Sequence, residues 1–199
     1  NTWKSWITFL FASAIASGGL AFGKFQSEKS NVMIVNEEDS SREIQDRFGL
    51  LGLKQEKLPI WFRVAQGAKL DADFIKLLVE EAKNKEVGVI FFDSLRAMHT
   101  AEENDSTAMQ IILDMLKTIT REGFTVIFTH HHRKKNLFQK SNDDPEMARG
   151  SSAISAAISG HISLEEIERE GSKFIILRHL KSKVCAKIQP VEIAITANA

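Results

Sequence analysis

Short apolar runs alternate with amphipathic stretches along this chain, and the alternation predicts its fold class. The segments 87–92 and 123–129 are rich in apolar residues, which is typical of strands buried on both faces of a sheet. Strands are expected at 32–35, 59–64, 87–92, 123–129, 162–164, 174–177 and 191–195, and helices at 5–17, after Ser40, at 71–84, 108–121 and 151–158. This order predicts an α/β fold, a mostly parallel sheet with helices on both faces.

Composition changes this picture little. The 199 residues carry 26 basic and 26 acidic side chains, so net charge gives no overall footprint for nucleic acid or an acidic membrane, and any such site must be local. The single cysteine, Cys185, excludes an intrachain disulfide and fits a reducing cytosol, so we expect a cytoplasmic protein without a membrane partner. The length predicts one domain over residues 1–199.

Polar residues directly after apolar runs are the candidates for chemistry, because ligands of parallel α/β sheets bind beyond the carboxyl ends of the strands. Asp93 follows the run Val89–Phe92 in the form of a Walker B aspartate, which serves a Mg²⁺ ion. We expect its carboxylate to be exposed at the edge of the sheet. The alternative is an aspartate that caps a helix and has only a structural role.

Three consecutive carboxylates, Glu37, Glu38 and Asp39, follow an earlier apolar run. Like charges this close are costly unless a cation or a function offsets them. We interpret Glu38 as a general base that activates water for attack on a γ-phosphate, and Asp39 as a support for the following helix. Ser40 and Glu43 have the spacing of a capping box, which predicts a helix start at this point.

Lys4 and Ser5 open the first predicted helix. A Lys-Ser pair at a helix N-terminus is typical of the end of a P-loop, in which the lysine reaches the outer phosphates and the hydroxyl ligates Mg²⁺. Because the sequence begins at Asn1, the first strand and part of the P-loop are expected to be missing from it, and Trp3 stands where the pattern has glycine. The alternative is a surface lysine beside an N-capping serine.

Three adjacent histidines, His130–His132, follow the run 123–129. Neighbouring side chains at a strand end point in alternate directions, whereas metal ligands are usually spaced along a helix face or a hairpin. We therefore interpret the cluster as the tip of a sensor strand, where one imidazole detects the γ-phosphate or polarises the attacking water, and not as a metal site.

An ordered series of segments resembles the plasmid RepA-type hexameric helicases and their RecA-like ATPase relatives, among them the DnaB helicases. The segments are Lys4-Ser5, Asn36–Ser40, Phe91–His99, Glu103–Ser106, Phe128–Lys134 and Arg149–Ser152. The resemblance extends over essentially the whole chain. It implies a RecA-like P-loop core that uses ATP and Mg²⁺.

The resemblance also implies roles for single residues. It puts the Walker lysine and serine on Lys4 and Ser5, the catalytic glutamate on Glu38, a base-stacking arginine of the DnaB relatives on Arg47, the Walker B aspartate on Asp93 and the sensor on His131. It further implies a hexameric ring with ATP between subunits. Three residues are candidates for the cationic finger, a side chain that one subunit contributes to the ATP site of its neighbour: Arg149, Lys181 and Lys183. Lys183 stands where DnaB has an arginine, and lysine lacks the planar guanidinium group.

In such rings the loops after the Walker B and sensor strands face the central channel, which here are 96–106 and 133–148. The second loop carries Arg133, Lys134, Lys135 and Lys140 with Phe138 among them. Basic side chains with an aromatic residue suit the phosphates and bases of single-stranded DNA, although acidic residues in this loop also fit a solvated surface. The leading hypothesis is an ATP-driven motor on single-stranded DNA. A non-translocating accessory or regulatory ATPase and a degenerate nucleotide-binding scaffold are the alternatives.

Overall fold

The computed structural model describes residues 3–53, 57–103, 105–130 and 151–196 and divides the chain into two compact units. One, the parallel-sheet unit, comprises Lys4–Thr100 and Asp114–His130. The other, the antiparallel-sheet unit, comprises Asn1–Trp3, Ala101–Leu113 and His131–Ala199. Helix α4 (Ser106–Arg121) is shared between them. One domain over the whole chain stays a prediction.

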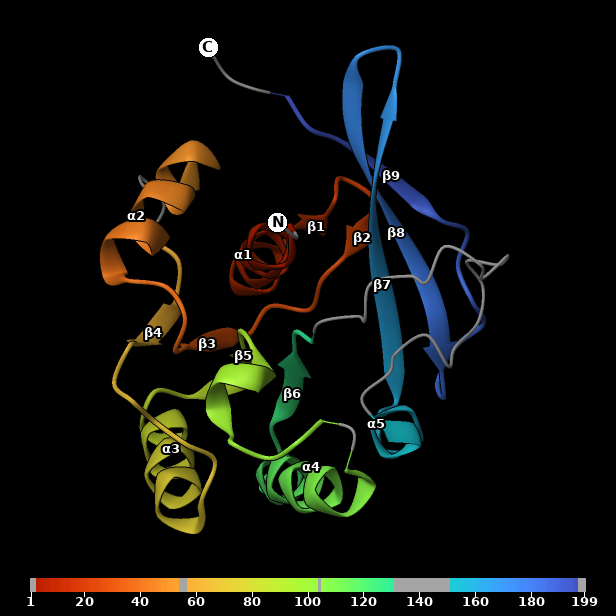
Figure 1. Ribbon diagram of the computed structural model, residues 1–199. Helices are drawn as coiled ribbons and strands as arrows, with labels where there is room; N and C mark the ends of the chain where they lie inside the picture. The colour runs from red at the N-terminus through yellow and green to blue at the C-terminus, as the bar shows by residue number, and fades with distance from the viewer. Residues whose placement is uncertain (1–2, 54–56, 104, 131–150, 197–199) are drawn as a thin grey trace. The chain divides into compact units, whose positions relative to one another are not determined.

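Four parallel strands form the sheet of the first unit (Figure 1). Their order is β4 (Ile60–Val64), β3 (Asn31–Asn36), β5 (Val87–Phe92) and β6 (Thr125–Phe128). Val35 pairs with Phe92, and Phe92 pairs with Phe128, so neighbouring strands end at a common edge. The parallel α/β fold predicted from the apolar runs is therefore confirmed, and its carboxyl edge is where polar residues gather.

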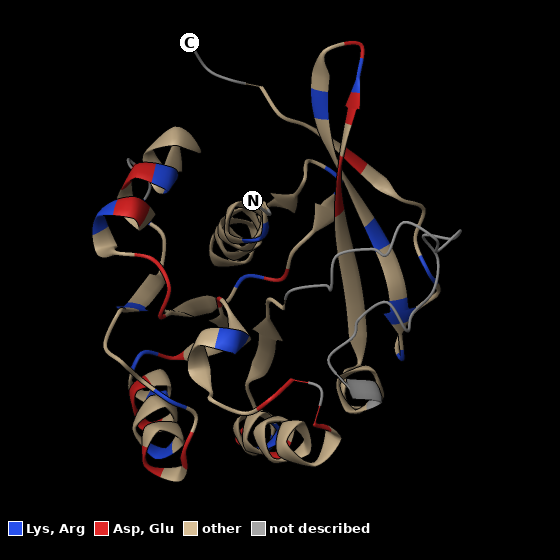
Figure 2. Cartoon of the chain, in the orientation of Figure 1, with Lys and Arg blue, Asp and Glu red and all other residues tan. Residues whose placement is uncertain are grey.

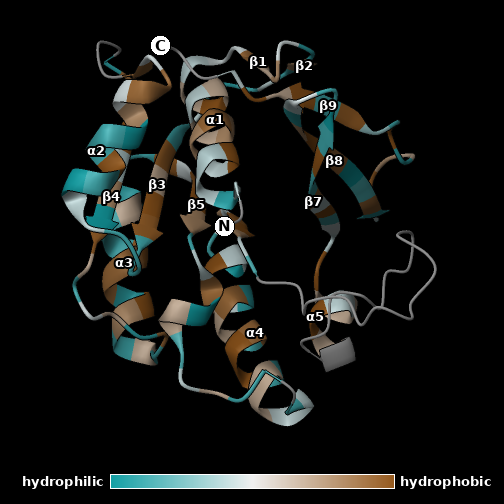
Figure 3. Cartoon of the chain, turned by 45° about the horizontal axis from the view of Figure 1, so that its top comes forward, coloured by the Kyte–Doolittle hydropathy of each residue, from teal (hydrophilic) through white to brown (hydrophobic). Residues whose placement is uncertain are grey.

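Helices cover both faces of this sheet, with α1 (Lys4–Ser17) and α2 (Ser41–Leu50) on one side and α3 (Ala72–Asn84) on the other (Figure 1). The first face is held by a core in which Phe9 of α1 packs with Ile34 of β3 and Phe91 of β5. The ring of Phe48 on α2 lies 4.9 Å from that of Phe9 and 5.3 Å from that of Phe62 on β4. Figure 3 shows the apolar residues along β3 and β5 that α1 covers.

Local signals set the ends of these helices. Gly18 follows α1 with a φ of 73°, a left-handed conformation that costs little without a Cβ atom, and its N–H donates to the carbonyl of Ile15. At the start of α2, Ser40 and Glu43 form the reciprocal hydrogen bonds of a capping box, as predicted. Asp71 caps α3 by accepting a 2.8 Å hydrogen bond from the N–H of Phe74.

The antiparallel-sheet unit contains α5 (Ser151–Ala157) and a sheet of β7 (Gly160–Arg169), β8 (Ser172–Ser182) and β9 (Val191–Ala194). β7 and β8 form a long hairpin, of which the sequence predicts only 162–164 and 174–177. The prediction omits 165–169 and 178–182, because charged and polar residues interrupt the apolar pattern there. Its two-residue turn, Glu170-Gly171, has positive φ at both positions, as the tightest hairpin turns require.

The remaining elements are short. Strands β1 (Leu20–Ala21) and β2 (Phe25–Gln26) pair with each other, and a 3₁₀ turn, η2 (Leu95–Met98), follows β5. Across the part of the chain that the structure describes, no helix has the length and apolar character needed to cross a membrane.

Candidate nucleotide-binding site

The carboxyl ends of β3, β5 and β6 bring several polar side chains together. Figure 2 shows the acidic segment that leaves β3 toward α2, which contains Glu37, Glu38 and Asp39. Asp93 directly follows β5, and Thr129 directly follows β6. The backbone continues the sheet for one more step here, because the N–H of Asp93 donates to the carbonyl of Val35 at 2.9 Å.

The turn after β3 is built around Asn36, which has no exposed surface. Its Oδ1 accepts hydrogen bonds from the backbone N–H groups of Glu38 at 3.0 Å and Asp39 at 2.8 Å. Its Nδ2 donates to Oδ2 of Asp39 at 3.0 Å. A buried amide that satisfies two backbone donors and one carboxylate fixes the path of the chain through this acidic turn.

The two neighbouring glutamates have different partners. The hydroxyl of Ser94 donates to Oε1 of Glu38, which holds this carboxylate beside the end of β5. Glu37 instead accepts a 2.7 Å hydrogen bond from the N–H of Gly67, in the loop after β4. Glu38 is therefore the glutamate that lies next to Asp93, and the charges of Glu38 and Asp39 both raise the pKa of Asp93.

Asp93 is 4% exposed, so the expectation of an exposed carboxylate is wrong. The residue directly follows β5, which lies between β3 and β6 in the sheet, and the side chains of Thr129 and Ser5 lie against its carboxylate. Burial raises the pKa of Asp93, and the hydroxyl groups of Thr129 and Ser5 offset part of that shift. Its Oδ1 accepts from Thr129 Oγ1 at 2.7 Å and no helix N–H bonds to its side chain within the described residues, which argues against the helix-capping alternative.

Lys4 and Ser5 lie at the N-terminus of α1, as predicted, and face the same strand ends. Lys4 Nζ donates to the backbone carbonyl of His130, just after β6, at 3.2 Å. The hydroxyl of Ser5 lies close enough to Asp93 to lower its pKa. The parallel-sheet unit thus brings together Lys4, Ser5, Glu38 and Asp93. These residues come from a helix start and two strand ends, the arrangement that anions and their counter-ions occupy in α/β proteins.

These residues fit a magnesium ion. Oδ2 of Asp93 is buried and makes no hydrogen bond of ordinary geometry within the described residues, and the neighbouring Ser5 offers a hydroxyl oxygen. Both are hard oxygen ligands, and Mg²⁺ typically takes one or two protein carboxylates and completes its shell with water and substrate phosphates. In the described part of the chain, no cluster of three or more His, Cys, Asp or Glu side chains is arranged for a metal ion.

Arg47, implied to stack on the nucleotide base, is paired with a carboxylate. Its Nη1 and Nη2 donate to the two oxygens of Asp39 at 2.6 and 2.9 Å. The Asp39 carboxylate raises the pKa of Arg47 further above its ordinary value. Both Nη1 and Nη2 of Arg47 therefore bind Asp39.

The candidate fingers of the described chain lie in the antiparallel-sheet unit. Lys181, in β8, donates from Nζ to the carbonyl of Ser155 on α5, so its ammonium group is engaged within its own subunit. Lys183, just beyond β8, is exposed. The remaining predicted residues lie outside the described residues: His131, Arg133, Lys134, Lys135, Phe138, Lys140 and Arg149.

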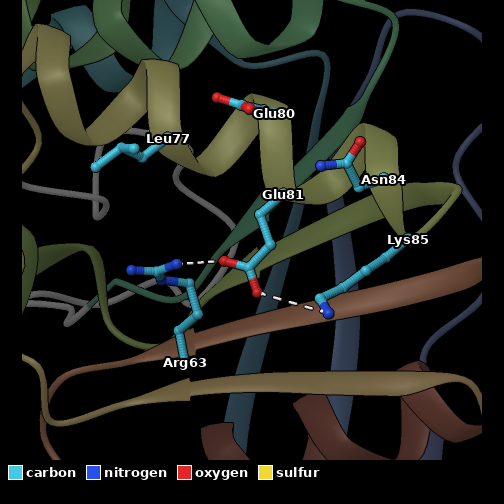
Figure 4. A pocket seen from close by; sticks show the side chains of 6 residues that line it. All are labelled: Arg63, Leu77, Glu80, Glu81, Asn84 and Lys85. Carbon is cyan, nitrogen blue, oxygen red and sulfur yellow. Dashed lines mark hydrogen bonds and ion pairs between the residues drawn. The ribbon is translucent and has the colours of Figure 1, made fainter.

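A separate hollow of about 380 Å³ lies between α3 and β4 (Figure 4). Glu81 lies at its centre and is paired with Arg63 and, at 3.9 Å, with Lys85. Leu77, Glu80 and Asn84 complete its lining. Because its charges neutralise one another across the hollow, it offers no residual charge for a nucleotide.

The sequence analysis assigns no role to three residues that hold the site, Asn36, Ser94 and Thr129, although each lies within a segment of the motif series. The available signal was position, because each is a small polar residue within two positions of the carboxyl end of a parallel strand. Each donates a hydrogen bond to a carboxylate of the cluster.

Comparison with known proteins gives one family. A family model described as an AAA domain matches residues 1–136, which is more than half of the chain and includes every element of the parallel-sheet unit. No curated protein matches the chain. The matched region contains the Lys4-Ser5 pair, the acidic turn after β3 and Asp93. The chain belongs to the AAA domain family of P-loop ATPases.

Proposed function

We propose that this chain is the motor part of an ATPase that hydrolyses ATP with Mg²⁺ and acts on single-stranded DNA, as a RepA-type replicative helicase or a related motor. The observation that carries the ATPase part is Asp93, a buried carboxylate with one oxygen bonded to Thr129 and the other without an ordinary protein partner. A buried charge left in this state is costly in a metal-free fold and is stabilised by a cation.

Each residue of the cluster has a distinct task in this proposal. Lys4, at the start of α1, neutralises charge on the outer phosphates together with the N–H groups of the helix terminus. Ser5 and Asp93 would hold a magnesium ion, which would supply positive charge at the phosphates during transfer of the γ-phosphoryl group to water. Glu38 accepts a proton from the attacking water. Ser94, which donates to Glu38, keeps the carboxylate at the end of β5.

The hydrogen bond from Ser94 orients the carboxylate of Glu38, the proposed base. A base that already accepts a hydrogen bond is oriented, so one oxygen remains for the attacking water while the other is held. This orientation supports Glu38 over Glu37, whose carboxylate is engaged with the loop after β4.

The action on DNA is supported by the resemblance of the motif series to RepA-type helicases and by the basic loop 133–148. Under the proposal, these side chains contact the phosphates and bases of a single strand in the channel of a hexameric ring. ATP would lie between subunits, with Arg149 or Lys183 completing the site of a neighbour.

One observation favours a non-translocating accessory or regulatory ATPase. The ammonium of Lys181 is bonded within its own subunit, so it is less available as a finger for a neighbour. A degenerate scaffold is the less favoured alternative, because Lys4, Ser5, Glu38 and Asp93 are all present in one cluster.

The test uses the full-length protein. Magnesium-dependent ATP hydrolysis that single-stranded DNA accelerates, together with unwinding of a forked duplex, supports the motor. Hydrolysis without stimulation or unwinding favours the accessory ATPase. Tight ATP binding without turnover, with or without DNA, favours the scaffold.

A further inference from the structure

Arg47 lies in the last turn of α2 with its guanidinium on Asp39, the residue directly after Glu38. Both terminal nitrogens donate to this one carboxylate, at 2.6 and 2.9 Å. The side chains are 24% and 16% exposed, so water screens the pair only in part. Such a bidentate ion pair fixes direction as well as distance, unlike a pair that shares a single hydrogen bond.

Asp39 passes this constraint to the turn. The oxygen that accepts from Arg47 Nη1 also accepts from Nδ2 of Asn36 at 3.0 Å. Oδ1 of the same fully buried asparagine accepts from the N–H of Glu38 at 3.0 Å. Consecutive hydrogen bonds thus connect the guanidinium of Arg47 to the backbone of Glu38.

The ion pair between Arg47 and Asp39 requires an ionised Asp39 carboxylate. Burial raises the pKa of Asp39, but hydrogen bonds from Arg47 and Asn36 outweigh burial and leave this pKa below its ordinary value. The carboxylate therefore stays ionised at neutral pH, and the link persists under the conditions in which an ATPase works.

We infer that Arg47 is a positioning residue for hydrolysis, because it fixes the turn that carries Glu38 through Asp39 and Asn36. The inference rests on the proposed function, since it takes Glu38 as the base. It differs from the base-stacking role that the resemblance implies for Arg47. Misplacing the base lowers kcat, whereas losing a contact with the nucleotide base raises KM and weakens binding.

The kinetic test compares Arg47→Lys, Asp39→Asn and the double variant. Lysine keeps the charge but cannot donate two parallel hydrogen bonds to one carboxylate. We expect kcat to fall about 10–100-fold in each single variant, the scale for a catalytic group misplaced by about 1 Å, with KM for ATP nearly unchanged. Because the residues act in series, the double variant should be no slower than the slower single variant. Arg42→Lys, an exposed position on the same helix, is the matched control and should keep kcat.

A second readout does not depend on catalysis. Hydrogen exchange at the amides of Glu38 and Asp39 should accelerate in Arg47→Lys and stay unchanged in the Arg42→Lys control. Unchanged exchange in Arg47→Lys overturns the inference, as does a raised KM at constant kcat or losses that multiply in the double variant. A wild-type protein without ATPase activity would refute the proposed function, while the exchange result would still decide the link from Arg47 to Glu38.

Discussion

Thr129 donates a 2.7 Å hydrogen bond from Oγ1 to Oδ1 of Asp93 and so joins the ends of the adjacent strands β6 and β5. This bond accounts for one carboxylate oxygen, while Oδ2 makes no ordinary hydrogen bond within the described residues. Asp93 is buried, and the negative charges of Asp39 and Glu38 lie near it. Burial and these neighbouring charges therefore disfavour the ionised form of Asp93.

Replacing Asp93 with asparagine should weaken Mg²⁺·ATP binding without destabilising the metal-free fold. Asparagine retains an oxygen to accept from Thr129 and removes the buried charge, so the melting temperature without nucleotide should stay constant or rise. Affinity should fall by about tenfold or more, since even outer partners of a metal ligand contribute 10–100-fold. Calorimetry and thermal unfolding measure the two effects. A large drop in melting temperature without nucleotide would instead assign Asp93 a structural role.

The raised pKa of Asp93 predicts a pH dependence. In the metal-free protein this carboxyl binds its proton at a higher pH than in the unfolded chain, because burial disfavours the charged form. Its contribution to stability is therefore least favourable above the raised pKa and improves as the pH falls through it. Mg²⁺ binding requires the carboxylate, so the affinity for Mg²⁺·ATP should decline over the same window. Titration calorimetry of wild type and Asp93→Asn checks this, because the variant should lose that part of the pH dependence.

Glu38→Gln should retain ATP binding and slow hydrolysis by about a hundredfold or more, the scale for the loss of a positioned base. Glutamine can still accept the hydrogen bond from Ser94, so the turn should keep its structure. Steady-state turnover and nucleotide affinity separate the two effects. Glu80→Gln, an exposed glutamate on α3, serves as the control. Equal turnover in Glu38→Gln and wild type would remove Glu38 from the chemistry.

The capping box of α2 should make a measurable contribution to the free energy of unfolding. Ser40→Ala removes the side chain that accepts from the N–H of Glu43, which should lower the free energy of unfolding by about 1 kcal/mol. Chemical denaturation measures the change. Ser41→Ala, the next residue along, should shift stability by less than about 0.5 kcal/mol, as most exposed substitutions do. Equal losses in the two variants would mean that the box contributes nothing specific.

The parallel sheet was predictable because its inner strands β3 and β5 are buried on both faces and so consist of apolar runs, whereas the edge strand β6, also expected to be buried on both faces, alternates exposed and half-buried residues. Val87–Phe92 carries that signal, and Asp93 is recognisable as the polar residue that ends it. Parts of the hairpin formed by β7 and β8 carry no such signal. Charged and polar side chains interrupt the apolar pattern at 165–169 and 178–182, and some of them pair across the strands, as Arg178 does with Glu165.

The polar residues at the strand ends were predictable from the sequence, but their network of hydrogen bonds was not. The carboxylates after β3 and the resemblance indicate Glu38 as the base, which stays a prediction. The bond from Ser94 to Glu38 joins residues 56 positions apart, and no local pattern encodes such a pairing. The burial of Asp93 was not predictable for a similar reason, since the residues that lie against its carboxylate, Thr129 and Ser5, are far from it in the sequence.

The last prediction concerns assembly. If ATP lies between subunits, activity per subunit should rise with protein concentration, and single-stranded DNA should raise it further. A finger supplied by a neighbour contributes about 10³–10⁵ in rate in comparable enzymes. Lys183→Ala tests this best among the described candidates, because Lys183 is exposed while Lys181 is bonded to Ser155 in its own chain. Lys187→Ala, at another exposed lysine of the same loop, is the control.

Mixed assemblies give the decisive form of this test. A Lys4→Ala subunit lacks the phosphate-binding lysine but keeps its finger, while a Lys183→Ala or Arg149→Ala subunit has the reverse defect. When the two are mixed, some interfaces pair an intact phosphate site with an intact finger, so part of the activity that each lacks alone should return. A finger that acted within its own subunit could not be restored in this way, since no subunit of the mixture has both parts. Mixtures that stay inactive, with activity independent of concentration, would assign hydrolysis to the isolated subunit and favour the accessory ATPase.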